Sequence, residues 1–203
     1  MKVTEGKKIY FASDNHLGIP DSRSSLIREK KFVKWLDTIK VDAHSIYLLG
    51  DLFDFWFEYK TVVPKGFTRV LGKIAELSDS GIPIYFFTGN HDMWVRDYFQ
   101  LELGVKVITE PQQFKINEKN FFIGHGDGLG PGDTSYKLMK KFITGNRFFK
   151  WCFRWIHPDI GVKLGQFLSK EKKLMSAKKD IGYLLYTSPS PRDAHESRMP
   201  SSA

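Results

Sequence analysis

Four short polar clusters in the first 127 residues contain the side-chain types that bind divalent metal ions. They supply carboxylates, imidazoles and one amide carbonyl, on Asp14, His16, Asp51, Asn90 and His125. Such mixed oxygen and nitrogen donors, without a thiolate, favour Mn, Fe or Zn in a catalytic site over a structural zinc site. Two such ions, about 3.5–4 Å apart, clamp a phosphate and make hydroxide available near neutral pH. The clusters therefore predict two-metal chemistry on a phosphate.

The spacing within the clusters supports this interpretation. Asp14 and His16 alternate along an extended segment, so both side chains project to the same side and can reach one ion. Asp51 offers two carboxylate oxygens, which allows it to bridge two ions. Each residue alone would be a weak signal, because an isolated histidine at a strand end is usually structural and an aspartate before a turn is often a cap.

The elements that must position these clusters alternate between strands and helices along the chain. The pattern predicts strands over 8–12, 45–49, 84–88 and 121–123, a short β stretch within 105–116, and helices over 24–39 and 67–78. Each cluster follows one of the predicted strands. In open α/β sheets, sites form outside the carboxyl ends of strands, so we expect the four clusters to meet there.

Composition narrows the class of protein. The chain has 203 residues, enough for one sizeable domain. Its one cysteine, Cys152, cannot form an internal disulfide, which fits a reducing cytoplasm. No apolar run is long enough to span a bilayer, and residues 1–8 lack the apolar stretch of a signal peptide. We therefore expect a cytoplasmic protein.

The net charge of +8 is concentrated in one segment. Residues 128–183 hold 12 Lys and Arg against 4 Asp and Glu, whereas positive and negative charges balance on either side of this segment. Such a segment is either a solvated face or a basic surface that meets phosphates, an anionic membrane or nucleic acid.

The same segment contains an unusual aromatic helix, predicted over 147–156. Phe and Trp residues occur on several of its faces, and a helix of this kind must be buried or must touch an apolar partner. Pro158 ends it. It is either part of a packed helical hairpin or part of a cap whose aromatic inner face holds lipid chains. We expect its rings to be buried, which argues against nucleic acid, because bases stack on exposed rings.

The last residues, 184–203, are rich in Ser and Pro and cannot pack a core. Their sequence resembles a translated sequencing adaptor, and a natural disordered tail is the alternative. We therefore divide the chain into a core (1–127), a helical cap insert (128–183) and a non-native tail (184–203).

The combined motifs resemble those of the calcineurin-like metallophosphoesterases: Asp14-x-His16, Gly50-Asp51-x-x-Asp54, Gly89-Asn90-His91-Asp92 and Gly124-His125. This resemblance implies a four-layer αββα sandwich of the α/β (α+β) class. It implies two divalent ions, with Mn expected and Fe or Zn as alternatives. Asp14 and His16 would bind one ion, Asp51 would bridge, and Asn90 and His125 would bind the other. His91 would be the general acid or a transition-state cation, and Asp92 would orient its ring.

A narrower resemblance points to the UDP-2,3-diacylglucosamine hydrolases of lipid A synthesis. It rests on residues 13–18, on the aromatic run 53–57, and on 126–129 followed by Asp133 and Tyr136. This branch releases UMP and 2,3-diacylglucosamine 1-phosphate from a lipid-linked UDP-sugar, as a peripheral protein on the anionic inner membrane. The resemblance implies substrate contacts from Asn90, His91, Asp133 and Ser169. His91 replaces the arginine of the best-known members, which indicates a sister branch.

Two alternatives remain open from the sequence: another phosphodiesterase or nucleotide diphosphatase of the same fold, and an inactive fragment. The family closes its site with a Gly-His-x-His motif, and none of the six histidines forms this pair. We therefore expect a C-terminally truncated chain without its last strands, with weak metal binding and low activity. The sequence leaves the oligomeric state open.

Overall fold

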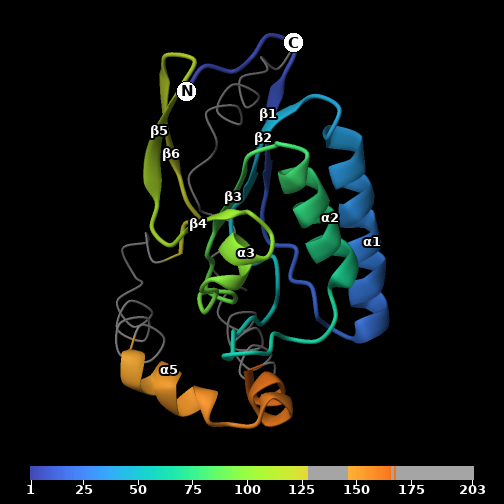
Figure 1. Ribbon diagram of the computed structural model, residues 1–203, viewed down its shortest axis with the longest axis vertical. Helices are drawn as coiled ribbons and strands as arrows, with labels where there is room; N and C mark the ends of the chain where they lie inside the picture. The colour runs from blue at the N-terminus through green and yellow to red at the C-terminus, as the bar shows by residue number, and fades with distance from the viewer. Residues whose placement is uncertain (128–145, 166, 168–203) are drawn as a thin grey trace, which may run out of the picture. The chain divides into compact units, whose positions relative to one another are not determined.

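The structure, a computed structural model, describes residues 1–127, 146–165 and 167 (Figure 1). Two predicted substrate-contacting residues, Asp133 and Ser169, lie outside these residues, as do the predicted tail (184–203) and much of the predicted cap insert. The predicted boundaries of the core, insert and tail stay predictions.

A parallel sheet of four strands forms the centre of the fold. Its strands lie in chain order, β1 (Lys8–Ala12), β2 (Ala43–Leu48), β3 (Ile84–Phe87) and β4 (Lys106–Ile108). Residues of β2 and β3 are almost all buried, as expected for short apolar runs of a sheet that is covered on both faces. Because the strands are parallel, their carboxyl ends lie at the same edge, where three of the four polar clusters follow; the fourth, at residues 124–127, follows a strand outside this sheet.

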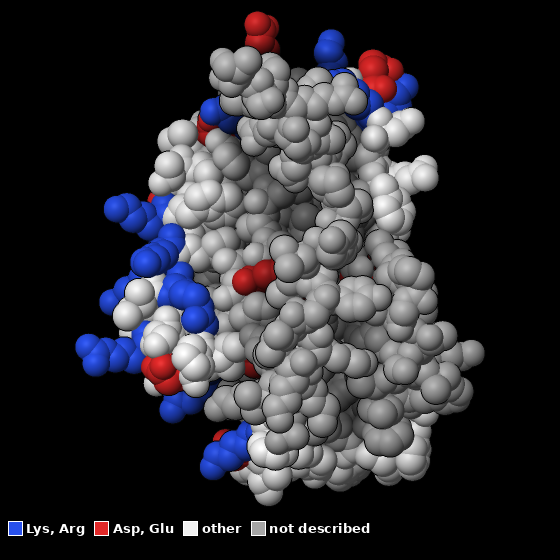
Figure 2. All heavy atoms as spheres, turned by 180° about the vertical axis from the view of Figure 1, so that it is seen from behind, with Lys and Arg blue, Asp and Glu red and all other residues white. Residues whose placement is uncertain are grey.

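Two helices, α1 (Ser22–Ile39) and α2 (Thr68–Asp79), lie side by side on one face of this sheet (Figure 1). Helix α1 begins at Asp21, whose carboxylate accepts a hydrogen bond from the Ser24 amide and caps the first turn. The main core lies between these helices and the sheet and includes Phe32, Leu36, Val70, Ile74, Ile46 and Phe86. The outer side of α1 is polar, and Figure 2 shows Lys and Arg gathered along the edge that this helix occupies.

An antiparallel hairpin of β5 (Gln112–Ile116) and β6 (Lys119–Ile123) covers the other face. Its Ile116 and Ile123 form a second, smaller core with Tyr47, Phe87 and Ile108 of the sheet. The α/β class and the predicted strands and early helices are thereby confirmed. The described residues build three layers: the helices, the parallel sheet and the hairpin.

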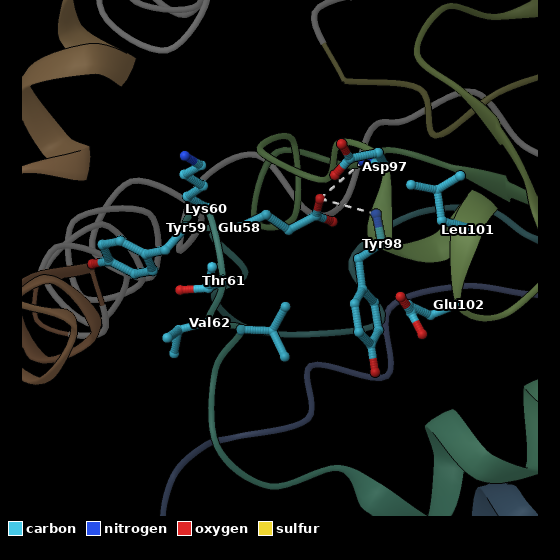
Figure 3. A pocket seen from close by; sticks show the side chains of 10 residues that line it. Glu58, Tyr59, Lys60, Thr61, Val62, Asp97, Tyr98, Leu101 and Glu102 are labelled. Carbon is cyan, nitrogen blue, oxygen red and sulfur yellow. Dashed lines mark hydrogen bonds between the residues drawn. The ribbon is translucent and has the colours of Figure 1, made fainter.

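A buried carboxylate fixes the aromatic segment that follows β2. Glu58 is 2% exposed, and its Oε2 accepts hydrogen bonds from the amides of Asp97 (2.9 Å) and Tyr98 (3.2 Å) (Figure 3). Its Oε1 accepts a hydrogen bond from Trp56 Nε1 (3.1 Å). These bonds hold the short helix α3 (Tyr98–Leu101), which the sequence pattern did not predict. The hollow beside it, of about 310 Å³, contains none of the predicted metal-binding residues in its lining.

The aromatic helix of the insert is present as α5 (Arg147–Arg154), followed by helical residues 158–165. Pro158 is the first residue of the second helix, whereas the first helix already ends at Arg154. Proline is tolerated there because the backbone N–H groups of a first helical turn have no acceptor within the helix, so its missing N–H costs no hydrogen bond. Phe153 packs against Phe55, Phe57 and Trp94 of the core, with ring centroids 4.6–6.3 Å apart.

The expectation that the rings of this helix are buried is wrong for three of them. Phe148, Trp151 and Trp155 are 66%, 56% and 76% exposed. Phe153 packs against the core, whereas these three rings face outward. The argument that this helix cannot stack its rings on bases therefore no longer holds, and the absence of a nucleic-acid partner stays a prediction. Among the described residues, no helix has the length and apolar character needed to cross a bilayer.

Candidate metal centre

The predicted ligands converge around one carboxylate oxygen at the carboxyl ends of the strands. Asp51 Oδ2 lies 3.7 Å from His16 Nε2, 3.9 Å from His91 Nε2 and 3.5 Å from His125 Nε2. Asp14 Oδ1 lies 3.8 Å from His16 Nε2. The structure thus brings together four residues that are up to 111 positions apart in the chain, together with His91.

These distances suit a metal centre. Three of them are longer than hydrogen bonds, and the 3.5 Å between His125 Nε2 and Asp51 Oδ2 is at the upper limit, so the polar atoms surround a common space. Two ligand atoms that each lie about 2.0–2.2 Å from one ion in tetrahedral geometry are roughly 3.4 Å from one another, close to the distances between the side chains here. In the part of the chain that the structure describes, two groups have potential ligand atoms within 4.8 Å of one another: Asp14 with His16 and Asp51, and His16 with Asp54 and His91. The donors present therefore fit divalent ions.

Two glycines allow the strand ends to approach this closely. A Cβ on Gly89 would lie 2.2 Å from Asp51 Oδ1 and 2.6 Å from the Asp51 amide nitrogen. A Cβ on Gly50 would lie 2.7 Å from both the Gly89 backbone and His125 Nδ1, and Gly50 has φ of 88°. Only glycine fits at these two positions, because a side chain would separate the loops that carry the ligands.

Three of the predicted ligands adopt a backbone conformation that non-glycine residues rarely occupy. Asp14, His16 and Asp51 have φ of 56°, 42° and 53°, in the left-handed region. Such residues persist where the surroundings over-determine them, and they cluster at functional sites. Here the Asp14 amide donates to the Gly50 carbonyl (3.2 Å) and the His16 amide to the Asp51 carbonyl (2.9 Å). The ligand loops hold one another in place.

Backbone carbonyls orient two of the imidazoles. His125 Nδ1 lies 2.7 Å from the Leu49 carbonyl oxygen, and His91 Nδ1 lies 2.8 Å from that of Asp54. A carbonyl can only accept, so Nδ1 carries the hydrogen in both rings and Nε2 is turned towards Asp51. Metal-binding histidines are usually oriented by such a hydrogen bond from the other ring nitrogen. The arrangement suits His125 as a ligand.

Asp92 makes contacts other than those the resemblance implies. It is fully buried, and its carboxylate accepts hydrogen bonds from the amides of Leu52 (2.9 Å) and Gly89 (2.7 Å). It thus ties the loop after β2 to the loop after β3. The carbonyl of Asp54 provides the hydrogen bond that orients the His91 ring. A role of Asp92 in orienting that ring stays a prediction.

Sequence reasoning missed Asp54 as a site residue, although its motif contained it. Asp54 is 1% exposed, and its Oδ1 lies 3.5 Å from His16 Nδ1 and 3.7 Å from His91 Nδ1. The signal was available in the spacing Gly50-Asp51-x-x-Asp54. Only the fold, however, turns this second carboxylate towards two histidines.

The close charges shift the proton affinities of the site. Burial lowers the pKa of His125, but the Asp51 carboxylate and the Leu49 carbonyl outweigh it and raise that pKa to about 9. Burial would raise the pKa of Asp51, yet His125 and His91 hold it below its usual value. Burial lowers the pKa of His91, although Asp51 opposes this. Burial and the nearby Asp51 charge raise the pKa of Asp92 to about 7.

The remaining predicted ligand, Asn90, lies half-buried between Gly89 and His91, in the loop that follows β3. It is at the predicted edge of the sheet, and its role as a ligand stays a prediction.

Comparisons of the sequence with known proteins identify relatives whose family uses such a site on phosphate esters. The family model described as calcineurin-like phosphoesterase matches residues 7–171. A protein of Porphyromonas gingivalis (strain ATCC BAA-308 / W83), named UDP-2,3-diacylglucosamine hydrolase, is 40% identical over 86% of this chain and 67% of its own length. Proteins of the same name from Histophilus somni (strain 129Pt) and Vibrio vulnificus (strain CMCP6) are 30% and 31% identical, over 86% and 71% of this chain and 72% and 57% of their own lengths.

Proposed function

The chain belongs to the calcineurin-like phosphoesterase family, and on this premise we propose that it hydrolyses the diphosphate of UDP-2,3-diacylglucosamine. The products would be UMP and 2,3-diacylglucosamine 1-phosphate, as in lipid A synthesis. The observation that carries the proposal is the relative of that name, which is 40% identical over 86% of the chain. The family match over residues 7–171 includes the residues of the metal centre.

Five residues would hold two divalent ions, for which we propose Mn, with Fe or Zn as alternatives. Asp14 and His16 would bind one ion, Asp51 would bridge the two, and Asn90 and His125 would bind the other. The approach of His16 Nε2 and His125 Nε2 to Asp51 Oδ2 supports the places of these three residues in the assignment. Two bound ions supply positive charge at the phosphate and a water of lowered pKa.

His91 would act on the diphosphate through Nε2. The Asp54 carbonyl fixes its Nδ1 hydrogen, so Nε2 is the atom that takes up or releases a proton beside the site. Burial lowers the pKa of His91 in the metal-free protein, whereas an anionic substrate would favour the protonated ring. We propose that this proton stabilises charge on the phosphate or on the leaving oxygen.

The aromatic insert would receive the lipid part of the substrate. Phe148, Trp151 and Trp155 expose their rings on α5, and residues 128–183 carry the whole excess of positive charge. Exposed aromatic rings beside Lys and Arg favour the interface of an anionic membrane. We therefore propose a peripheral protein on the cytoplasmic side of the inner membrane. Asn90 and His91, with Asp133 and Ser169 of the insert, would contact the substrate.

Hydrolysis assays test the proposal. The purified chain with Mn should release UMP from UDP-2,3-diacylglucosamine, and chelation should abolish the release. The variant His91→Asn should lower kcat by about 10²–10⁴-fold, the usual contribution of a general acid. The matched control is His44→Asn, at the opposite end of β2 from Asp51.

Hydrolysis of bis-p-nitrophenyl phosphate without release of UMP from the lipid substrate would favour the alternative, a generic phosphodiesterase or nucleotide diphosphatase. Failure of this chain to hydrolyse either compound would contradict both activities for these 203 residues and favour the remaining alternative, an inactive fragment.

A further inference from the structure

Helix α1 grips the loop that carries His16 from outside the metal centre. Arg28 Nη2 donates hydrogen bonds to the carbonyl oxygens of His16 (2.8 Å) and Ile19. Three positions earlier on the same helix, Ser25 Oγ accepts a hydrogen bond from the Gly18 amide (2.7 Å). Residues three apart lie on one face of a helix, so the two side chains form one clamp on residues 16–19.

The clamp acts on the most constrained part of the site. His16 has φ of 42°, and its amide donates to the Asp51 carbonyl. The next residue, Leu17, is fully buried and donates to the Leu52 carbonyl. The inner side of the loop is thus fixed by the loop after β2, and its outer side by Arg28. Both peptide groups of His16 are held, which is the condition for keeping a left-handed residue in place.

The hydrogen bonds that Arg28 donates to the described residues go to backbone carbonyls of one loop. Among the described residues, no carboxylate lies within salt-bridge distance of the Arg28 guanidinium, although the pKa of Asp21, which hydrogen bonds from Ser24 lower, is lowered further by its charge. The buried Nε of Arg28 has no hydrogen-bond acceptor among these residues. An unsatisfied buried donor on a charged group is destabilising. The guanidinium instead donates hydrogen bonds to the carbonyl oxygens of His16 and Ile19, in the loop that carries the ligand His16. Its geometry is therefore directed at the shape of that loop.

We propose that Arg28 is a positioning residue for the metal centre: it holds His16 in the backbone conformation that brings Nε2 beside Asp51 Oδ2. This inference rests on the proposed function only in taking the converging residues as a metal centre. It assigns no contact between Arg28 and the substrate.

Mn²⁺ affinity of the metal-free protein tests the proposal, measured by calorimetry and by the electron paramagnetic resonance of free Mn²⁺. Arg28→Met removes the donors and keeps an apolar stem, and its Kd for Mn²⁺ should rise about 10–100-fold, as for other groups that orient metal ligands. Arg28→Lys keeps the charge but not the planar guanidinium, so its Kd for Mn²⁺ should lie between those of the unmodified protein and of Arg28→Met. The matched control is Arg23→Met, an exposed residue of the same helix, which should leave the Kd unchanged.

Stoichiometry separates positioning from folding. A positioning residue raises the Kd while each folded molecule still binds the same number of ions, and saturating Mn²⁺ restores kcat. A residue needed only for folding lowers the number of binding-competent molecules and leaves their Kd unchanged, which would overturn the proposal. An unchanged Kd in Arg28→Met, or no Mn²⁺ binding by the unmodified protein, would overturn it as well.

The proposed function fails separately. If the unmodified chain binds Mn²⁺ but releases no UMP from UDP-2,3-diacylglucosamine, the substrate assignment is wrong, and the comparison of Kd values still decides the role of Arg28.

Discussion

Replacing Gly89 with alanine tests the close approach of the loops that follow β2 and β3. The added Cβ would lie 2.2 Å from Asp51 Oδ1 and 2.6 Å from the Asp51 amide nitrogen. Ordinary contacts require about 3.5 Å or more, so the two loops must part by about 1 Å. A rotation of the Asp51 side chain relieves the first contact only, because the second is with backbone.

Two effects should follow in Gly89→Ala. Overpacking of this kind destabilises by about 1–3 kcal/mol, and about 2 kcal/mol lowers the Tm of a protein of this size by roughly 4–8 °C. A displacement of about 1 Å at Asp51 also misplaces the group nearest to three histidines, and errors of that size can lower activity about 10²-fold. Thermal unfolding without metal measures the loss of stability. Release of UMP, together with Mn²⁺ titration, measures the effect of misplacing Asp51.

Gly72→Ala is the matched control for this substitution. Gly72 lies exposed in the interior of α2, and a Cβ there would meet nothing within 4 Å. Alanine should therefore stabilise the helix by about 0.5–1 kcal/mol and leave Mn²⁺ affinity unchanged. If Gly89→Ala matched the unmodified protein in both Tm and Mn²⁺ affinity, the loops could not be as close as described, and the reasoning would be refuted.

Two further predictions concern buried carboxylates. Glu29 is 4% exposed and accepts hydrogen bonds from the amides of Arg69 (2.9 Å) and Val70 (3.2 Å) at the start of α2. Glu29→Ala leaves these buried amides without an acceptor, so it should lower the free energy of unfolding by about 1–3 kcal/mol in urea denaturation. The exposed control Lys30→Ala should leave that free energy unchanged. The folded-state pKa of Asp92, about 7, lies above the ordinary aspartate value of 3.8 because the carboxyl is buried. Its contribution to stability is therefore present below about pH 4 and is lost as the pH rises through 7. Denaturation midpoints of the metal-free protein should fall over this window, and Asp92→Asn should abolish that fall; an equal fall in the variant would contradict the assignment.

The sequence alone determined the local elements and the order of the ligands. Apolar runs and amphipathic stretches predicted β1 at its observed bounds, Lys8–Ala12, and placed α1, α2, β2 and β3 within about two residues at each end. These features are local, because a strand or helix records its buried face in its own periodicity. Asp14, His16, Asp51 and His125 converge because each follows a strand whose carboxyl end reaches the same region.

Only the tertiary structure decided which partners these side chains meet. Asp92 bonds to backbone amides in two loops, and Asp54 turns a carbonyl towards the ring of His91, across 37 positions of the chain. Neither partner leaves a periodic trace in the sequence. The exposure of Trp151 and Trp155 also depends on which side of α5 packs against the core, and the sequence does not indicate that side because aromatic residues occur on several faces of the helix. Backbone hydrogen bonds and packing partners arise between segments distant in the chain, so the sequence indicates which groups are available and the fold selects the pairs.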